Sequence, residues 1–196
     1  PPNLTKVELT QVVRSSKRIV AAAMAFQMQQ RGENLTKCFH NADGPRLKPL
    51  VFEVGDAAEE MSRRDCYARE VVNAVGFVLS EFPGLNLHNR VAIVVPNQEF
   101  MQFLTEAIKP GLAGLAGNHH FVLKSARDAN RVIGCHSNEG DEQWLLVDTV
   151  ANFDGLERLI VVAVDLDSVM DQADDRSNTS AETRSRLYRA MTRAHM

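Results

Sequence analysis

The stretch Leu159-Ile-Val-Val-Ala-Val164 is an unbroken run of apolar residues near the end of the chain. It is far shorter than the roughly 20 residues that a membrane-spanning helix needs. A short continuous run of Val, Ile and Leu, without polar residues at alternate positions, is typical of parallel strands that are covered on both faces. The run therefore predicts a buried strand of a parallel sheet.

Similar apolar runs recur upstream and alternate with helical patterns. The runs are Leu50 to Val54, Arg90 to Val95 and Trp144 to Val147. This alternation predicts an α/β fold, an open parallel sheet flanked by helices on both faces. Ligands of such sheets bind beyond the carboxyl ends of the strands, so we expect the functional edge in the loops after Val95, Val147 and Val164. The predicted helices lie near Ser16 to Gln29, Asp65 to Glu81, Gln98 to Lys109 and Ala181 to Ala194.

The bulk composition fits one globular domain over residues 1–196. Hydrophobic residues make up 44% of the chain, charged residues make up 24%, and the formal net charge is -3. This charge excludes a generally basic nucleic-acid module, so contact with nucleic acid must be confined to a patch or groove. The odd, widely spaced cysteines and the lack of a membrane span or leader predict an intracellular protein, in the cytoplasm or the nucleus. The start at Pro1-Pro2 leads us to expect a piece of a longer protein.

Positive charge concentrates in the last segment, Arg186-Leu-Tyr-Arg-Ala-Met-Thr-Arg-Ala-His-Met196. Apolar residues recur there at i, i+3, i+4 and i+7 from Leu187, which predicts the buried stripe of an amphipathic helix. Arg186, Arg189 and Arg193 fall together on another face of that helix. The pattern predicts an anion-binding surface on a packed support.

Three other segments resemble ligand sites only superficially. The aspartates of Asp165 to Asp175 lack the central Gly and closing Glu of a calcium loop, so we expect a solvated loop. The glycines of Pro110 to Gly117 are not followed by Lys-Ser/Thr, so we expect a flexible turn rather than a phosphate cradle. The remaining candidate metal ligands are two pairs of adjacent residues, His119 with His120 and Cys135 with His136. This is not the spacing of zinc ligands, so we predict no metal site.

Three ordered segments carry a family resemblance. They are Leu9-Thr-Gln-Val-Val-Arg-Ser-Ser16, Thr149-Val-Ala-Asn-Phe-Asp-Gly-Leu-Glu157 and Tyr188-Arg-Ala-Met-Thr-Arg-Ala194. In this order they resemble the fourth, fifth and sixth motifs of superfamily 1 helicases of the UvrD/Rep kind. Family members read Leu-x-x-Asn-Tyr-Arg-Ser, then Thr-x-His-x-x-Lys-Gly-Leu-Glu or a Phe-Gln-Gly-x-Glu variant, and then Tyr-Val-Ala-x-Thr-Arg-Ala. The short spacing between the fourth and fifth motifs fits the compact organisation of Schlafen-like members.

The resemblance implies the second RecA-like domain of a P-loop NTPase, without the half that carries the Walker A and B motifs. ATP with Mg²⁺ would be held mainly by the N-terminal RecA-like domain of the same parent protein. Arg193 would be the arginine finger and Arg14 a second γ-phosphate contact, and such a guanidinium accelerates phosphoryl transfer by on the order of 10³ to 10⁵. Glu157 would contact the ribose, Gly155 would permit close approach, and Thr149 would contact single-stranded DNA or RNA.

Simpler roles for these residues remain open at this point. Arg14 could pair with an acid near a helix start, Glu157 could be a surface carboxylate, and Thr149 could merely end a strand. Arg186 and Arg189 are expected to be surface charges or partners of carboxylates. Tyr188 is expected to pack rather than stack on a base.

Two positions depart from the family pattern, and both bear on nucleic-acid contact. Ala151 stands where the family has His, and Asp154 stands where it has Lys or Gln. A negative charge on the path of a polyanion weakens binding. The departures therefore keep open a second hypothesis, a degenerate helicase-like domain that acts as a regulatory or protein-interaction module without ATP turnover.

Overall fold

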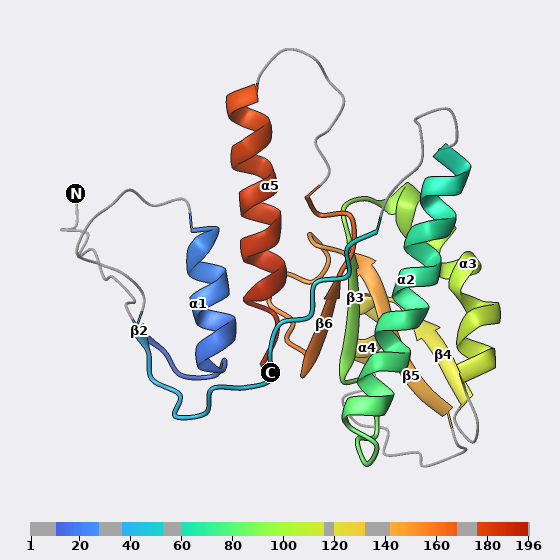
Figure 1. The fold of residues 1–196 in the computed structure, drawn as a ribbon, viewed down its shortest axis with the longest axis horizontal. Coiled ribbons are helices and arrows are strands. Elements are labelled where there is room, and N and C mark those ends of the chain that lie inside the picture. The colour runs from blue at the N-terminus through green and yellow to red at the C-terminus, as the bar shows by residue number, and fades with distance from the viewer. Residues whose placement is uncertain are drawn as a thin grey trace.

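The computed structural model describes residues 11–27, 37–52, 60–115, 120–131, 142–167 and 176–195. Helices and strands alternate along most of the chain (Figure 1). In chain order they are β1 Gln11–Val12, α1 Lys17–Ala25, β2 Lys37–Cys38, α2 Glu60–Glu81, β3 Val91–Val95, α3 Gln98–Leu115, β4 His120–Lys124, α4 Ala126–Arg131, β5 Glu142–Thr149, β6 Ile160–Ala163 and α5 Arg176–Met191.

The main sheet has four parallel strands in the order β4-β5-β3-β6. In this sheet Val95 lies opposite Thr149, and Val94 lies opposite Ala163, so the carboxyl ends of β3, β5 and β6 share one edge. Every residue of β3 is buried. The prediction of an α/β fold built on a parallel sheet is confirmed.

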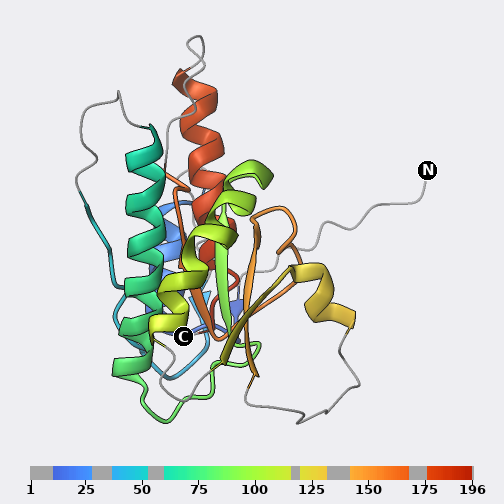
Figure 2. The same cartoon turned by 90° about the vertical axis from the view of Figure 1, so that its right-hand side faces the viewer.

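The two faces of the sheet are covered by different helices. Val91, Ile93 and Val95 pack in a core cluster with α2 and α3, whereas Ala92 and Val94 pack in a second cluster with α4 and α5. Figure 2 shows α2 and α3 on one side of the sheet and α4 on the other. Burial on both faces explains why the strands read as continuous apolar runs.

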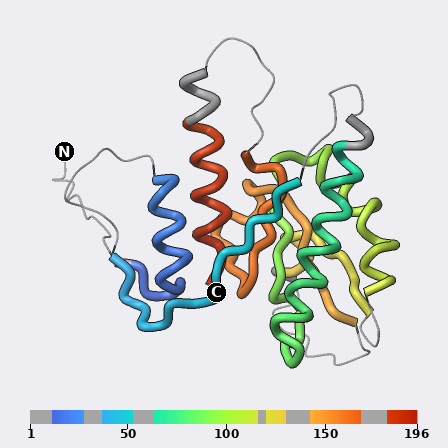
Figure 3. The backbone as a smooth tube through the Cα atoms, viewed as in Figure 1, coloured from blue at the N-terminus to red at the C-terminus, as the bar shows by residue number. Residues whose placement is uncertain are grey.

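A smaller module sits beside the sheet. It consists of the parallel pair β1–β2 and of α1, which packs against α5. Residues 37–52 then run from this module to α2, as the tube in Figure 3 shows. Because α1 buries Ile19, Val20 and Ala23, the N-terminal segment is held close to the C-terminal helix.

The strand predicted at Leu50 to Val54 is wrong over its described part, Leu50 to Phe52, which forms no strand. Val51 is 92% exposed, so the run lies along the surface. The edge of the main sheet next to β5 is taken instead by β4, which the sequence did not reveal because polar His120 and Lys124 bound its short apolar stretch.

The flexible turn predicted from Pro110 to Gly117 is also wrong over its described part, because α3 continues through Pro110 to Leu115. Leu112 is buried in the core cluster. A Cβ added at Gly111 would lie 2.6 Å from the Val72 side chain. Tertiary packing of this last turn against α2 therefore outweighs the weak helical tendency of Gly and Pro.

The C-terminal helix ends earlier than predicted. α5 stops at Met191, and Arg193 lies beyond it, so the three arginines do not share one helical face. Arg186 is buried and pairs with Glu182, one turn earlier, which confirms the expected carboxylate partner. The chain leaves the helix because residues 193–195 adopt an extended pairing with Arg158.

Candidate functional site

Three segments that are far apart in the sequence meet just beyond the end of α5. Residues 193–195 lie between residues 14–16 of the small module and residues 157–158 that precede β6. These eight residues are called the seam below. The seam joins the three segments that carry the family resemblance, so the structure brings together residues from each of them.

Backbone hydrogen bonds hold the seam on both sides. Arg158 N donates to Arg193 O (2.9 Å), and His195 N donates to Arg158 O (3.1 Å), which forms a parallel bridge. On the opposite side Ser16 N donates to His195 O (3.1 Å). The path of residues 193–195 is therefore fixed independently of their side chains.

The side chains of the seam form an ionic network around Glu157. One carboxylate oxygen, Oε1, pairs with the Arg14 guanidinium. The other, Oε2, accepts a hydrogen bond from His195 Nε2 at 2.8 Å. The Arg14 side chain is 50% exposed and that of Glu157 is 25% exposed, so the carboxylate is the more firmly held partner. The simpler role left open for Arg14, pairing with an acid near a helix start, is therefore present in the structure, and its contact with γ-phosphate stays a prediction.

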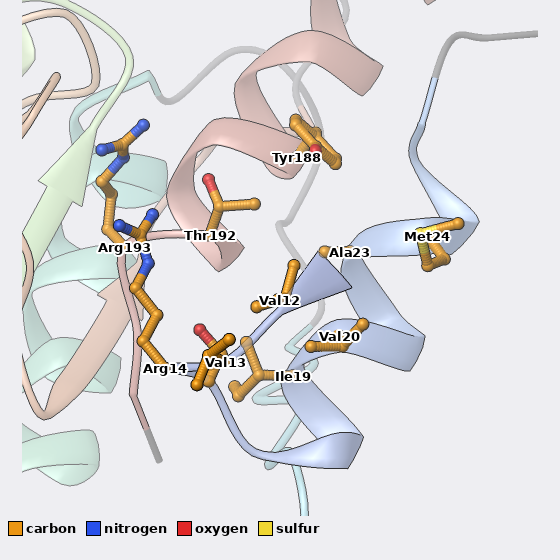
Figure 4. A pocket seen from close by; sticks show the side chains of 11 residues that line it. Val12, Val13, Arg14, Ile19, Val20, Ala23, Met24, Tyr188, Thr192 and Arg193 are labelled. Carbon is orange, nitrogen blue, oxygen red and sulfur yellow. The ribbon is translucent and has the colours of Figure 1, made fainter. Parts of the chain in front are cut away.

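Arg14 and Arg193 line one pocket of about 490 Å³. Figure 4 shows both arginines on the same side of it, with Val12, Ile19 and Val20 opposite. The Arg193 Nε atom is buried without a hydrogen-bond partner, and no described carboxylate forms an ion pair with this guanidinium. A buried donor without a partner costs free energy unless a ligand or water satisfies it. Among the residues that the structure describes, the pocket thus carries one guanidinium with an acidic partner, Arg14, and one without, Arg193.

The pocket does not lie where the sheet topology predicted it. None of its lining residues comes from the loops after Val95, Val147 or Val164. In a sheet of this type a helix runs back along the strands, so its C-terminal end lies near their amino ends. Arg193, which follows α5, therefore lies near the amino end of β6. Half-buried Tyr188 packs in the wall of the pocket with Thr192.

Thr149 is the last residue of β5 and Gly155 lies in the turn that leads from β5 to the seam, and neither lines the pocket. Thr149 is 8% exposed, and its hydroxyl accepts a hydrogen bond from Asn152 N at 3.4 Å. Gly155 is exposed and has φ +82°, with no atom near the position that a Cβ would take. Glycine is required there by the backbone conformation rather than by close contact within this chain.

Two acids of the same turn have roles that the sequence did not reveal. Buried Asp148 accepts hydrogen bonds from Asn152 Nδ2 (2.6 Å) and from Ala126 N at the start of α4 (2.9 Å). Asp154 forms a two-point ion pair with Arg189, with Nε to Oδ1 at 3.1 Å. The charge of Asp154, expected to face a polyanion, is therefore compensated within the chain. Both interactions fix the turn against neighbouring helices.

A second polar cluster lies at the carboxyl edge of the sheet. Asp165, which has φ +53°, accepts hydrogen bonds from Tyr67 Oη (2.6 Å) and from Arg63 (3.2 Å). Burial, together with this hydrogen bond to Asp165, raises the pKa of Tyr67 to about 12. The hydrogen bond to Tyr67 and the nearby charge of Asp165 raise the pKa of Arg63. The cluster joins α2 to the end of β6, and each of its charges is compensated.

Comparison with protein families, with curated proteins and with solved structures finds no match to this chain. Within the described ranges no three His, Cys, Asp or Glu side chains are grouped to hold a metal ion. His119, Cys135 and His136, which we predicted not to bind a metal, lie outside those ranges, as do residues 168–175 of the aspartate loop. No helix in the described part of the chain combines the length and apolarity needed to cross a membrane.

Proposed function

We propose that the chain is the second RecA-like domain of a superfamily 1 helicase or translocase and that it supplies two arginines to ATP. The observation that carries this proposal is the shared pocket of Arg14 and Arg193, which belong to opposite ends of the sequence. ATP with Mg²⁺ would be bound mainly by the N-terminal RecA-like domain of the same parent protein. The chain alone would not hydrolyse ATP.

The chemistry of phosphoryl transfer supports two guanidiniums at this position. Negative charge spreads over the γ-phosphate oxygens in the transition state, and guanidinium groups delivered across a domain interface stabilise it. Arg193 lines the pocket, and its buried Nε has no hydrogen-bond partner, which supports a role in binding such an oxygen. The sequence has no Gly-x-x-x-x-Gly-Lys-Ser/Thr loop, so the phosphate cradle has to come from the first domain.

Nucleic acid is proposed to pass along the turn between β5 and the seam. Ala151, Asn152 and Gly155 are exposed there, whereas the Thr149 side chain is buried. Contact with single-stranded DNA or RNA would therefore use the backbone of the turn and would couple to the pocket through Glu157. The ion pair of Asp154 with Arg189 reduces the repulsion that an isolated acid would exert on phosphates.

The test is ATP hydrolysis by the protein that carries this chain together with its first RecA-like domain, with and without single-stranded DNA and RNA. Arg193→Ala is expected to reduce nucleic-acid-stimulated turnover by on the order of 10³, while ATP binding stays largely intact. The matched control is Arg184→Ala, because Arg184 is an exposed arginine of α5 that does not line the pocket. Near-normal turnover in Arg193→Ala would refute the proposal.

A second function, a regulatory or protein-interaction module without ATP turnover, is favoured by exposed apolar side chains in residues 37–52. Phe39 is 66% exposed and Val51 is 92% exposed. Contiguous exposed apolar patches mark interaction sites, and this function requires Phe39 and Val51 to contribute to such a surface. This function predicts nucleotide-independent partner binding that survives Arg193→Ala and is lost in Phe39→Ser with Val51→Ser. Turnover by the two-domain protein would exclude it.

A further inference from the structure

The Glu157 carboxylate forms an ion pair with Arg14, whereas Arg193, in the same pocket, has no acidic partner among the described residues. Both of its oxygens are engaged, Oε1 by Arg14 and Oε2 by His195 at 2.8 Å. A carboxylate on a guanidinium occupies the sites that a phosphate oxygen would use, since arginine binds both groups with the same donors. Glu157 therefore stands where an anion bound to Arg14 would compete with it.

In the ion pair between Arg14 and Glu157, the arginine is the residue that can move. The Arg14 side chain is 50% exposed and belongs to a long, rotatable residue type. Glu157 is next to Arg158, whose backbone is fixed by the bridge to residues 193–195, and its other oxygen is held by His195. An exchange of partners would move the arginine and leave the carboxylate in place.

We propose that Glu157 is an internal competitor: it pairs with Arg14, which lines the pocket, and polyphosphate has to take Arg14 from it. The ligand class is a triphosphate group, which takes Arg14 from Glu157 and meets Arg193 in the same pocket. This inference rests on the proposed function, and it adds a regulation of the site to it. It also differs from the ribose contact that the family resemblance implies, because it acts on triphosphate without a sugar.

His195 is the positioning residue of this exchange. When Arg14 leaves, the Glu157 carboxylate keeps the hydrogen bond from His195 Nε2 and does not remain without a partner. A released carboxylate without that donor would be less stable, because a half-buried charged group needs a hydrogen-bond partner. Loss of the His195 donor should therefore weaken triphosphate binding, and only while the carboxylate is present.

The experiment measures binding of inorganic triphosphate to the 196-residue chain by calorimetry. Glu157→Gln is expected to increase the affinity about two- to fivefold, the range of a partly exposed ion pair. Gln keeps an oxygen that can accept the hydrogen bond from His195. The matched control is Asp154→Asn, which also removes an acid paired with an arginine, but its partner Arg189 does not line the pocket, so the affinity should be unchanged. An equal increase in both variants would show a general charge effect and overturn the proposal.

A second comparison tests the role of His195. His195→Ala should lower triphosphate affinity in the parent sequence and have no effect in the Glu157→Gln background. A merely structural role for His195 would instead lower the affinity by the same factor in both backgrounds, and that result would refute its positioning role.

A measurement on the unmodified chain covers the case in which Glu157→Gln does not fold. Nitrogen-15 NMR of the arginine Nε–H groups and of the histidine rings follows the exchange directly. Triphosphate should shift the Arg14, Arg193 and His195 signals together, because Glu157 loses one partner and keeps the other. If only Arg193 shifts, Glu157 does not compete and the inference fails while the proposed function stands. If Arg193 does not respond at all, the isolated chain does not hold triphosphate in this pocket and the inference fails, whereas the proposed function is decided separately by ATP turnover in the two-domain protein.

Discussion

The β3 core and the seam hold this molecule together by opposite means. In β3 every side chain is buried, and its two faces pack against different helices. In the seam the contacts are hydrogen bonds and ion pairs, and Arg14 is half exposed. Apolar burial supplies most of the stability of a domain, whereas exposed polar groups can exchange partners with a ligand. Under the proposed function, the sheet supplies the stability of the domain and the seam supplies ligand binding. Substitutions can test this division.

The largest effect on stability is expected in the core. Leu104 is fully buried between α3 and the sheet. Leu104→Ala should lower the free energy of unfolding by about 2–5 kcal/mol, the cost of lost burial and of the cavity left behind. Urea denaturation followed by circular dichroism measures it. In the fraction that remains folded, triphosphate affinity should be unchanged. A large loss of affinity would contradict the division of stability and binding between the sheet and the seam.

A smaller effect is expected where the turn approaches the seam. Gly155 has φ +82°, and Gly155→Ala should cost about 1–2 kcal/mol because an L side chain disfavours that conformation. Gly114 provides a control of opposite sign, because it is an exposed glycine in α3 with open space around it. Gly114→Ala should stabilise by roughly 0.5–1 kcal/mol. Thermal melts of both variants decide this, and a loss at both positions would contradict the account.

The ion pair between Asp154 and Arg189 should matter less for stability than either glycine. Its side chains are 54% and 34% exposed, and partly exposed pairs contribute about 0–1 kcal/mol. Asp154→Asn should therefore change the free energy of unfolding by less than about 1 kcal/mol. The same melts in low and high salt test it, since a screened pair loses its contribution as salt rises. A change that does not depend on salt would point to packing instead.

The cluster at the carboxyl edge of the sheet should influence stability at alkaline pH alone. The pKa of Tyr67 is raised to about 12, above its usual value near 10. Its contribution is therefore complete below about pH 10 and is lost as the pH rises through about 12. Absorbance titration of tyrosinate in a Tyr188→Phe background isolates Tyr67. Asp165→Asn should lower the midpoint, but burial should keep it above 10. An unchanged midpoint would exclude Asp165 as a cause.

The sequence predicted the elements whose signal is local. The runs at 90–95, 144–147 and 159–164 became β3, β5 and β6, because continuous apolar residues need burial on both faces. The edge strand β4 was missed, and the surface run from Leu50 was wrongly predicted as a strand. Short apolar stretches look alike, and only tertiary packing decides which of them forms a strand. The same holds for Pro110, whose helix is stabilised by contacts with α2.

For the site, motif order predicted a set of residues, and the structure shows how some of them meet. Arg14 and Arg193 share a pocket, as a common ligand requires. Acidic partners for Arg14 and Arg189 were foreseen as a class, but their identities, Glu157 and Asp154, and the contact of Glu157 with His195 were not. Such pairings depend on where α5 ends and on the bridge between residues 158 and 194. No local pattern encodes them.

The central claim is that Arg14 and Arg193 act on one anion. A double-mutant cycle of Arg14→Ala and Arg193→Ala, read by calorimetry with inorganic triphosphate, tests it most directly. Each single change should weaken binding about tenfold or more, the scale of a hydrogen bond to a charged group. The double variant should lose clearly less than the product of the two single losses, because residues that contact one ligand are coupled. Losses that simply multiply, or a variant that binds as well as the unmodified chain, would contradict the claim.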